Sequence, residues 1–123
     1  MVRRVLIVDD EPNIVISIEF LMRQRGYETC VASDGQMALD EVERFRPDLV
    51  LLDVMMPKRD GYEVCQLLRA GDWPNMKIIM LTAKGREAEV AKGLAVGADA
   101  YVTKPFSTRD LVEQVDALLD AGS

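Results

Sequence analysis

The chain has 123 residues, which is the size of one domain. It carries 15 Lys and Arg against 21 Asp and Glu, a formal net charge of −6, and 49% of its residues are hydrophobic. The acidity disfavours direct binding to nucleic acid, because neutralising phosphates needs a basic patch, and the hydrophobic fraction is too high for a disordered chain. We therefore expect a single globular domain over residues 1–123.

The histidine and cysteine content limits the chemistry further. Histidine is absent, which excludes Ser–His and Cys–His nucleophile pairs, imidazole metal sites and a phosphohistidine on this chain. Cys30 and Cys65 form no CxxC motif, so we expect neither a zinc site nor a disulfide framework and infer a reducing, cytoplasmic environment. The longest apolar region, Leu49 to Met56, is interrupted by Asp53 and cannot span a bilayer, so we expect no membrane partner.

The first half of the chain alternates short apolar runs with amphipathic stretches. Val5–Val8 is a continuous apolar run, which is typical of a parallel strand covered on both faces. Pro12 suits the first turn of a helix whose apolar residues recur at helical spacing until Gly26. A weaker, more alternating strand over 27–32 is expected near an edge of the sheet. A second helix follows, with Met37 in the apolar stripe that we assign to the core.

The second half continues the same alternation. The predicted elements are a strand over Leu49–Leu52, a loop at 54–60, a helix, a strand over Lys77–Leu81, a helix at about 86–96, a short strand over Ala100–Val102, and a last helix that begins near Ser107 or Thr108. Strict alternation predicts an α/β fold, a five-stranded parallel sheet with helices on both faces and right-handed crossovers.

Polar side chains follow four of the predicted strands. Asp9 and Asp10 follow the first strand, Asp53 the third, Thr82 the fourth and Lys104 the fifth. In open α/β sheets the functional site lies beyond the carboxyl ends of the strands. If these strands are neighbours, three carboxylates, a hydroxyl and an ammonium group meet at one edge of the sheet.

Three neighbouring carboxylates repel one another and require a cation or a raised pKa. Because no His or paired Cys offers softer ligands, oxygen ligands favour Mg²⁺ or a similar hard ion. A carboxylate beside Mg²⁺ can attack phosphorus and form an aspartyl phosphate, while the metal and Lys104 share the charge of the transferring group. Thr82 can donate a hydrogen bond to a phosphoryl oxygen.

Over essentially its whole length, the chain resembles the response-regulator receiver domains of two-component signal transduction, including the chemotaxis regulators. The matching motifs are Val8-Asp9-Asp10-Glu11, Asp53-Val54-Met55-Met56-Pro57 with Asp60-Gly61, Leu81-Thr82-Ala83, Gly97-Ala98-Asp99-Ala100-Tyr101 and Lys104-Pro105-Phe106. Each motif is weak alone, but all of them in order, each at a strand end, are highly specific. The resemblance implies a flavodoxin-like, doubly wound sheet of order 2-1-3-4-5 with five helices.

The resemblance also implies which residues accept the phosphoryl group and hold the metal. Asp53 matches the phosphoacceptor, Asp10 the acid that binds Mg²⁺ directly, and Asp9 its partner, which often acts through water. Met55 matches the position whose backbone carbonyl binds the metal. Asp9 and Asp10 could instead cap the first helix, since Asp is a favoured N-cap residue.

Three further residues match the switching parts of a receiver domain. Thr82 and Lys104 match the hydroxyl and the lysine that hold the phosphoryl group. Tyr101 matches the aromatic switch residue, which turns inward when Thr82 moves toward the phosphate, although it could also be plain core. The Lys104–Pro105 bond is commonly cis in the family, and an X–Pro bond makes the cis form accessible.

The function implied by the resemblance is that of a regulatory phosphoacceptor, not an enzyme beyond its own phosphotransfer and dephosphorylation. The phosphoryl donor would be a sensor histidine kinase or a histidine phosphotransfer protein. Phosphorylation of Asp53 would shift the face formed by the predicted helix at 86–96, the following strand and the last helix. That face would control an output domain or a downstream protein, with homodimerisation as another option.

Two other functions stay open at this point. One is a Mg²⁺-dependent phosphohydrolase that works through an aspartyl phosphate, although such enzymes usually place a second acid two residues after the nucleophile, where this chain has Met55. The other is a phosphate-independent interaction module with the receiver fold, against which the complete site argues. The sequence also leaves open whether the domain is free-standing or part of a longer chain, and which kinase serves it.

Overall fold

Strands and helices alternate along the part of the chain that the structure, a computed structural model, describes: residues 2–54, 60–71, 73, 75–83 and 97–121. The strands are β1 (Arg4–Val8), β2 (Glu28–Ala32), β3 (Leu49–Asp53), β4 (Lys77–Ala83) and β5 (Ala100–Lys104). The helices among these residues are α1 (Pro12–Gln24), α2 (Gly35–Phe45), α3 (Gly61–Ala70) and α5 (Thr108–Ala121). The helix predicted at about 86–96 lies outside the described residues.

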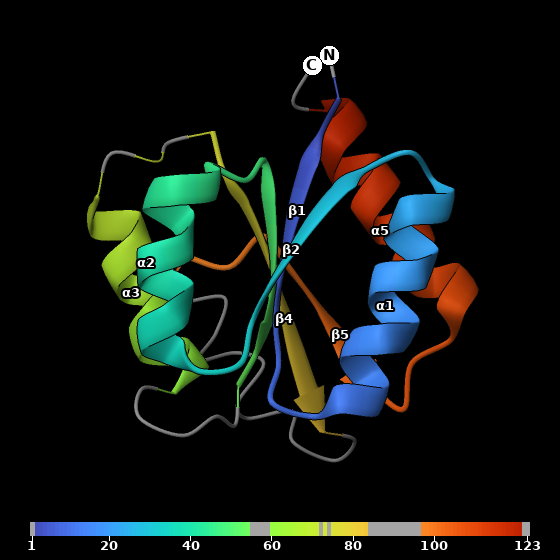
Figure 1. The fold of residues 1–123 in the computed structure, drawn as a ribbon, viewed down its shortest axis with the longest axis horizontal. Helices are drawn as coiled ribbons and strands as arrows, with labels where there is room; N and C mark the ends of the chain where they lie inside the picture. The colour runs from blue at the N-terminus through green and yellow to red at the C-terminus, as the bar shows by residue number, and fades with distance from the viewer. Residues whose placement is uncertain (1, 55–59, 72, 74, 84–96, 122–123) are drawn as a thin grey trace.

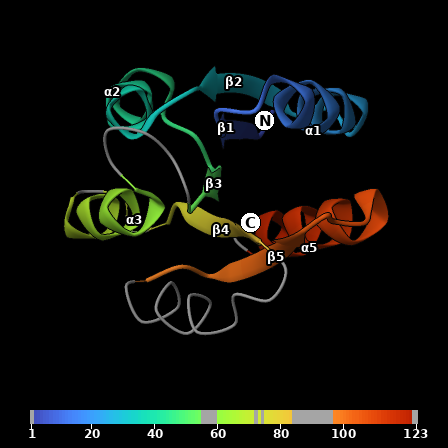
Figure 2. The ribbon, with the colours of Figure 1, turned by 90° about the horizontal axis from the view of Figure 1, so that it is seen from below.

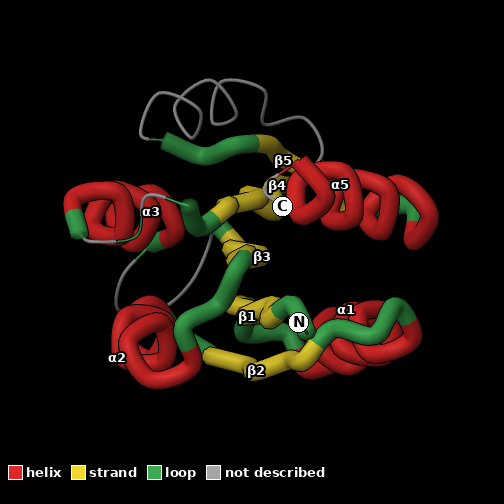
Figure 3. Tube along the Cα trace, turned by 90° about the horizontal axis from the view of Figure 1, so that it is seen from above, coloured by secondary structure: helices red, strands yellow, loops and turns green. Residues whose placement is uncertain are grey.

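The five strands form one parallel sheet in the order β2-β1-β3-β4-β5. The predicted α/β class and the flavodoxin-like order 2-1-3-4-5 are therefore confirmed. Strand β2, whose sequence is weaker and more alternating, lies at an edge as predicted, and β5 forms the other edge (Figure 3). Because β3 sits between β1 and β4, the ends of β1, β3 and β4 are adjacent.

Among the described residues, α1 and α5 cover one face of the sheet and α2 and α3 cover the other (Figure 3). Successive side chains of a strand point to opposite faces, and both faces are buried here. Val8 of β1 packs in a core that includes Val42 of α2, whereas its neighbour Ile7 packs in a second core with Ile18 of α1 and Leu111 of α5. This arrangement explains why the inner strands are apolar without alternation.

Aspartate side chains cap two of the helices. The Asp34 side chain accepts a hydrogen bond from Met37 N at 2.9 Å at the start of α2, and the Asp60 side chain accepts one from Glu63 N at 2.9 Å at the start of α3. Asp is a favoured N-cap residue, since its carboxylate satisfies a free N–H group of the first turn. Helix α1 begins at Pro12 without a side-chain cap.

The structure corrects three details of the sequence prediction. Strand β4 continues to Ala83 and β5 to Lys104, because the two strands stay paired beyond the expected ends, with Thr82 opposite Thr103. Met37, assigned to the core, is 40% exposed, because the side of α2 that is buried carries Ala38 and Val42 instead.

The strands all run in one direction, so their carboxyl ends share one edge. In Figure 1 the chain termini lie at the top and the strands end at the bottom, and Figure 2 views that lower edge. None of the helices in the described residues is long and apolar enough to cross a membrane. The polar residues that follow the strands in the sequence therefore belong to this lower edge.

Candidate functional site

Three aspartates meet at the carboxyl edge of the sheet. Asp9 directly follows β1 and Asp53 is the last residue of β3, and these two strands are neighbours. One carboxylate oxygen from each of Asp9, Asp10 and Asp53 lies within 4.8 Å of the others. Asp9 and Asp53 are only 1% and 5% exposed, while Asp10 is exposed. The structure thus brings together the three acids that the sequence places at strand ends.

Lys104, at the end of β5, reaches across the sheet edge to these acids. Its Nζ donates a hydrogen bond to Asp9 Oδ2 at 2.8 Å and lies 3.5 Å from Asp53 Oδ1 and 3.7 Å from Glu11 Oε1. Burial lowers the pKa of the Lys104 ammonium, but the hydrogen bond to Asp9 and the charges of the three acids outweigh burial, so this pKa is raised. Lys104 is therefore a charged partner of the acids rather than a solvated surface lysine.

Asp9 has two partners at once. Its Oδ1 accepts a hydrogen bond from Glu11 N at 2.9 Å, and its Oδ2 accepts the bond from Lys104. The alternative that Asp9 or Asp10 caps α1 is wrong, because the N-cap residue is Glu11 and no side chain caps this helix. Through its bond to Glu11 N, Asp9 instead has a local role in the turn before the helix. It coexists with a place in the acidic cluster, since a carboxylate has two oxygens.

Thr82 lies on β4, one position beyond the residue that pairs with Asp53. It is 2% exposed, and its Oγ1 has no hydrogen-bond partner within the described chain. Leaving a buried hydroxyl unpaired costs about 1–3 kcal/mol, so most buried hydroxyls have a partner. Thr82 therefore offers a free donor next to the strand that ends in Asp53.

The start of α3 packs directly on the backbone of Asp53. Gly61 N donates a hydrogen bond to Val54 O at 2.9 Å. A Cβ atom at residue 61 would collide with the Asp53 carbonyl oxygen and lie 2.9 Å from Val54 Cα. Asp60-Gly61 is one of the motifs shared with receiver domains, and its spacing alone indicates no role for Gly61. The structure shows that only glycine allows this approach.

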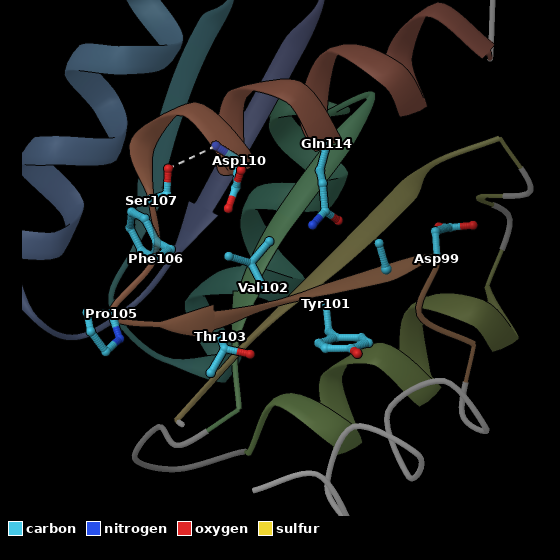
Figure 4. A pocket seen from close by; sticks show the side chains of 10 residues that line it. Asp99, Tyr101, Val102, Thr103, Pro105, Phe106, Ser107, Asp110 and Gln114 are labelled. Carbon is cyan, nitrogen blue, oxygen red and sulfur yellow. Dashed lines mark hydrogen bonds between the residues drawn. The ribbon is translucent and has the colours of Figure 1, made fainter. Parts of the chain in front are cut away.

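Tyr101 lies on β5 and its side chain is turned outward, with 42% of the residue exposed. The alternative that Tyr101 belongs to the core is therefore wrong. It lines a pocket of about 650 Å³ between β5 and the first turns of α5, on the same side of β5 as Thr103 (Figure 4). The pocket also includes Phe106 and Asp110.

Two expectations from the resemblance concern the neighbouring backbone. The Lys104–Pro105 peptide bond is cis, as expected. Met55 lies outside the described residues, so the expected metal contact of its carbonyl stays a prediction.

The comparisons with known proteins agree on one family. The response regulator receiver domain matches residues 5–116. The chain is 33% identical to the receiver domain of the Francisella response regulator 1452, with a TM-score of 0.91 over 98% of this chain and 99% of that chain. It is 30% identical to the chemotaxis response regulator CheY4 of Vibrio cholerae, with a TM-score of 0.90 over 96% and 99%. It is also 32% identical to the receiver domain of a signal transduction histidine kinase from Syntrophus aciditrophicus, with a TM-score of 0.89 over 97% and 91%.

Proposed function

Since the chain belongs to the response regulator receiver family, we propose that it is a phosphorylation-dependent switch in which Asp53 accepts a phosphoryl group. Receiver domains are regulatory phosphoacceptors of two-component signalling rather than enzymes that turn over a substrate. We take residues 1–123 as a single receiver domain that acts in the cytoplasm.

One observation carries this proposal: a buried carboxylate, an ammonium group and an unpaired hydroxyl converge at one sheet edge. Asp53 is 5% exposed, Lys104 Nζ lies 3.5 Å from its Oδ1, and Thr82 Oγ1 is buried without a partner in the described part of the chain. A transferring phosphoryl group spreads negative charge over its oxygens, which an ammonium and a hydroxyl donor can stabilise. These groups therefore suit phosphoryl transfer better than a purely structural ion pair, which would leave Thr82 unexplained.

The acidic cluster fits a divalent metal. Asp9, Asp10 and Asp53 offer only carboxylate oxygens, within 4.8 Å of one another, which are the ligands that Mg²⁺ prefers. We propose that Asp10 and Asp53 bind the ion directly, that Asp9 acts beside them, and that the Met55 carbonyl completes the protein ligands. When bound, Mg²⁺ supplies positive charge that reduces repulsion between the carboxylates and the phosphoryl oxygens.

A phosphohistidine donor must lie outside residues 1–123, because these residues include no histidine. A carboxylate oxygen of Asp53 attacks the phosphorus of a phosphohistidine, a P–O bond forms, and the P–N bond breaks. The electron pair of the broken bond passes to the imidazole nitrogen. Because the other ring nitrogen of the phosphohistidine carries a proton, the donor's ring leaves as neutral imidazole. Lys104 and Thr82 hold the phosphoryl oxygens of the resulting acyl phosphate.

The proposed output is a change in the face around β5. Thr82 and Lys104 lie on the paired strands β4 and β5, so movement of either toward the phosphoryl group acts on both strands. Tyr101, exposed on β5, is the proposed switch residue, and the pocket beside it lies on the proposed output surface. The partners are then a sensor histidine kinase or histidine phosphotransfer protein on the input side. On the output side they are a linked domain, a separate protein or a second copy of the chain.

The direct test is covalent labelling with acetyl phosphate. Wild-type protein with Mg²⁺ is expected to gain the mass of one phosphoryl group, whereas Asp53→Asn gains none. Asp40→Asn serves as the control, since Asp40 is an exposed acid on α2. Intact-mass spectrometry gives the readout, with and without Mg²⁺.

Three outcomes would contradict the proposal. Absence of label on the wild type would favour a phosphate-independent module. Label on Asp53→Asn would place the phosphoacceptor elsewhere. Sustained release of product from a small phosphate ester would favour the phosphohydrolase alternative.

A further inference from the structure

The Arg69 side chain, in the last turn of α3, binds both the residue before β4 and the segment before β5. Its Nε donates to Gly97 O at 2.8 Å, its Nη1 to Met76 O at 2.6 Å, and its Nη2 to Asp99 Oδ2 at 2.6 Å. The side chains of Arg69 and Asp99 are 23% and 28% exposed, so the contacts are partly shielded from water. The planar guanidinium can donate in three directions at once, which an ammonium cannot do with the same geometry.

The contact between Arg69 and the chain before β5 is close. Gly97 has a φ of +111°, and a Cβ atom there would lie 2.6 Å from Arg69 Cγ. Asp99 Oδ2 also accepts a hydrogen bond from Ile78 N at 2.8 Å, and Asp99 N donates to Ile78 O at 2.8 Å. These two bonds fix Asp99 to Ile78, the second residue of β4, immediately before β5 begins. Arg69 therefore holds the start of β5.

The other end of α3 touches the proposed phosphoacceptor. Gly61, the first residue of the helix, packs on the backbone of Asp53 and Val54. The helix runs without interruption from Gly61 to Ala70, so one rigid element links the end of β3 to the start of β5. Figure 2 shows the segment that leads into β5 passing beside α3.

We propose that Arg69 is a positioning residue that couples the phosphorylation site to Tyr101 through α3. This inference rests on the proposed function of Asp53. A phosphoryl group that displaces the backbone at Asp53 and Val54 displaces the start of α3, and Arg69 passes the displacement to Asp99. Tyr101 lies two residues beyond Asp99, and both line the pocket of the proposed output surface (Figure 4). The route is separate from the pairing of Thr82 with β5.

The test compares Arg69→Met and Asp99→Asn with a matched control, Arg25→Met. Arg25 makes an ion pair of the same length, 2.6 Å, with Asp116 on the opposite face of the sheet. Each variant is titrated with beryllofluoride and Mg²⁺, a mimic of the phosphoryl group. The amide NMR shifts of Val54 and Tyr101 report the site and the output surface separately, and thermal unfolding reports stability.

The expected result is a loss of coupling without a loss of binding. In Arg69→Met and Asp99→Asn, the titration should change the amide shift of Val54 as much as in the wild type. The change in the amide shift of Tyr101 should fall by about twofold or more, a size typical of altered coupling. Arg25→Met should leave both responses intact. Arg69→Lys carries the test if Arg69→Met does not fold, and it should give the same loss at Tyr101.

Two results would overturn the inference on Arg69 and leave the proposed function of Asp53 intact. One is an unchanged Tyr101 response in the Arg69 variants. The other is an equal loss of the Tyr101 response in Arg25→Met, which would indicate general destabilisation. A wild type in which Val54 itself does not respond would overturn the proposed function and this inference with it.

Discussion

The Thr82 hydroxyl has no hydrogen-bond partner among the described residues. At 2% exposure, water cannot readily solvate that hydroxyl in place of a protein group. An isosteric apolar side chain would remove the unpaired group without leaving a cavity. Stability and phosphoryl transfer therefore place opposite demands on this residue.

Thr82→Val should raise the free energy of unfolding by about 1 kcal/mol, because the buried hydroxyl is removed. The same change should lower the yield of acetyl-phosphate labelling, because a donor to the phosphoryl group is lost. Urea denaturation and intact mass measure the two effects, and Thr82→Ser, which keeps the hydroxyl, is the control for labelling. A valine variant that is less stable and labels fully would show that Thr82 is structural.

Tyr27 is tied to α5 far from the proposed site. Its hydroxyl donates to Asp116 Oδ1, and Arg25 binds the other oxygen of that carboxylate. Burial, followed by the hydrogen bond to and the charge of Asp116, raises the pKa of Tyr27 above its ordinary value of 10.0. The folded protein therefore holds the phenol proton more tightly than the unfolded chain.

The stabilisation from Tyr27 should be fully present below pH 10 and be lost as the pH rises through the pKa of the folded state. Tyr27→Phe should lower the free energy of unfolding by about 1 kcal/mol at neutral pH. The difference from the wild type should shrink above pH 10, as measured by denaturation at a series of pH values. A difference that grows with pH would contradict this sign.

Helix α3 packs directly on the backbone of the site. Gly61 meets the Asp53 backbone at one end and Arg69 fixes the start of β5 at the other. Side-chain volume added at Gly61 must move either the helix or the end of β3, because the neighbouring atoms are backbone. The position of α3 and the geometry of the site are therefore linked.

Gly61→Ala should destabilise the fold by about 1–3 kcal/mol through overpacking and should also reduce labelling of Asp53. The matched control is Gly26→Ala, where a Cβ atom meets nothing within 4 Å but the φ of +86° is unfavourable for alanine. The control should cost about 1–2 kcal/mol without changing the extent of labelling. Full labelling of Gly61→Ala at wild-type stability would show that α3 does not constrain the site.

For the molecule as a whole, the acidic cluster adds a local repulsion to a chain whose net charge is already −6. Lys104 offsets part of this repulsion through Asp9 and Asp53. A cation that binds the folded state and not the unfolded chain must raise the stability of the fold. Metal binding can therefore be measured as a change in global stability, without any phosphoryl donor.

Mg²⁺ at a hundredfold excess over its Kd should raise the free energy of unfolding by about 2.7 kcal/mol. Asp10→Asn should abolish most of this gain and should stabilise the metal-free protein, because one negative charge leaves the cluster. Asp40→Asn should respond to Mg²⁺ as the wild type does. Equal gains in all three proteins, measured by thermal or urea unfolding, would place the metal elsewhere.

The sequence by itself determined the alternation of elements and the residues that could form the site. Continuous apolar runs such as Val5–Val8 predict strands buried on both faces, and parallel strands bring their carboxyl ends to one edge. Asp9, Asp53 and Lys104 could therefore be placed together before their distances were known. The strand order came from the family resemblance, because periodicity carries no information on which strands are neighbours.

Only the tertiary structure decided the contacts between segments that are distant in sequence. The pairing with β4 extends β5 to Lys104, and the position of α2 leaves Met37 exposed. The contact of Gly61 with the Asp53 backbone and the bonds from Arg69 to the start of β5 have no local signature. Such contacts depend on how the helices settle on the sheet, a property of the packed molecule, whereas the pattern of apolar and polar residues records only which side of each element is buried.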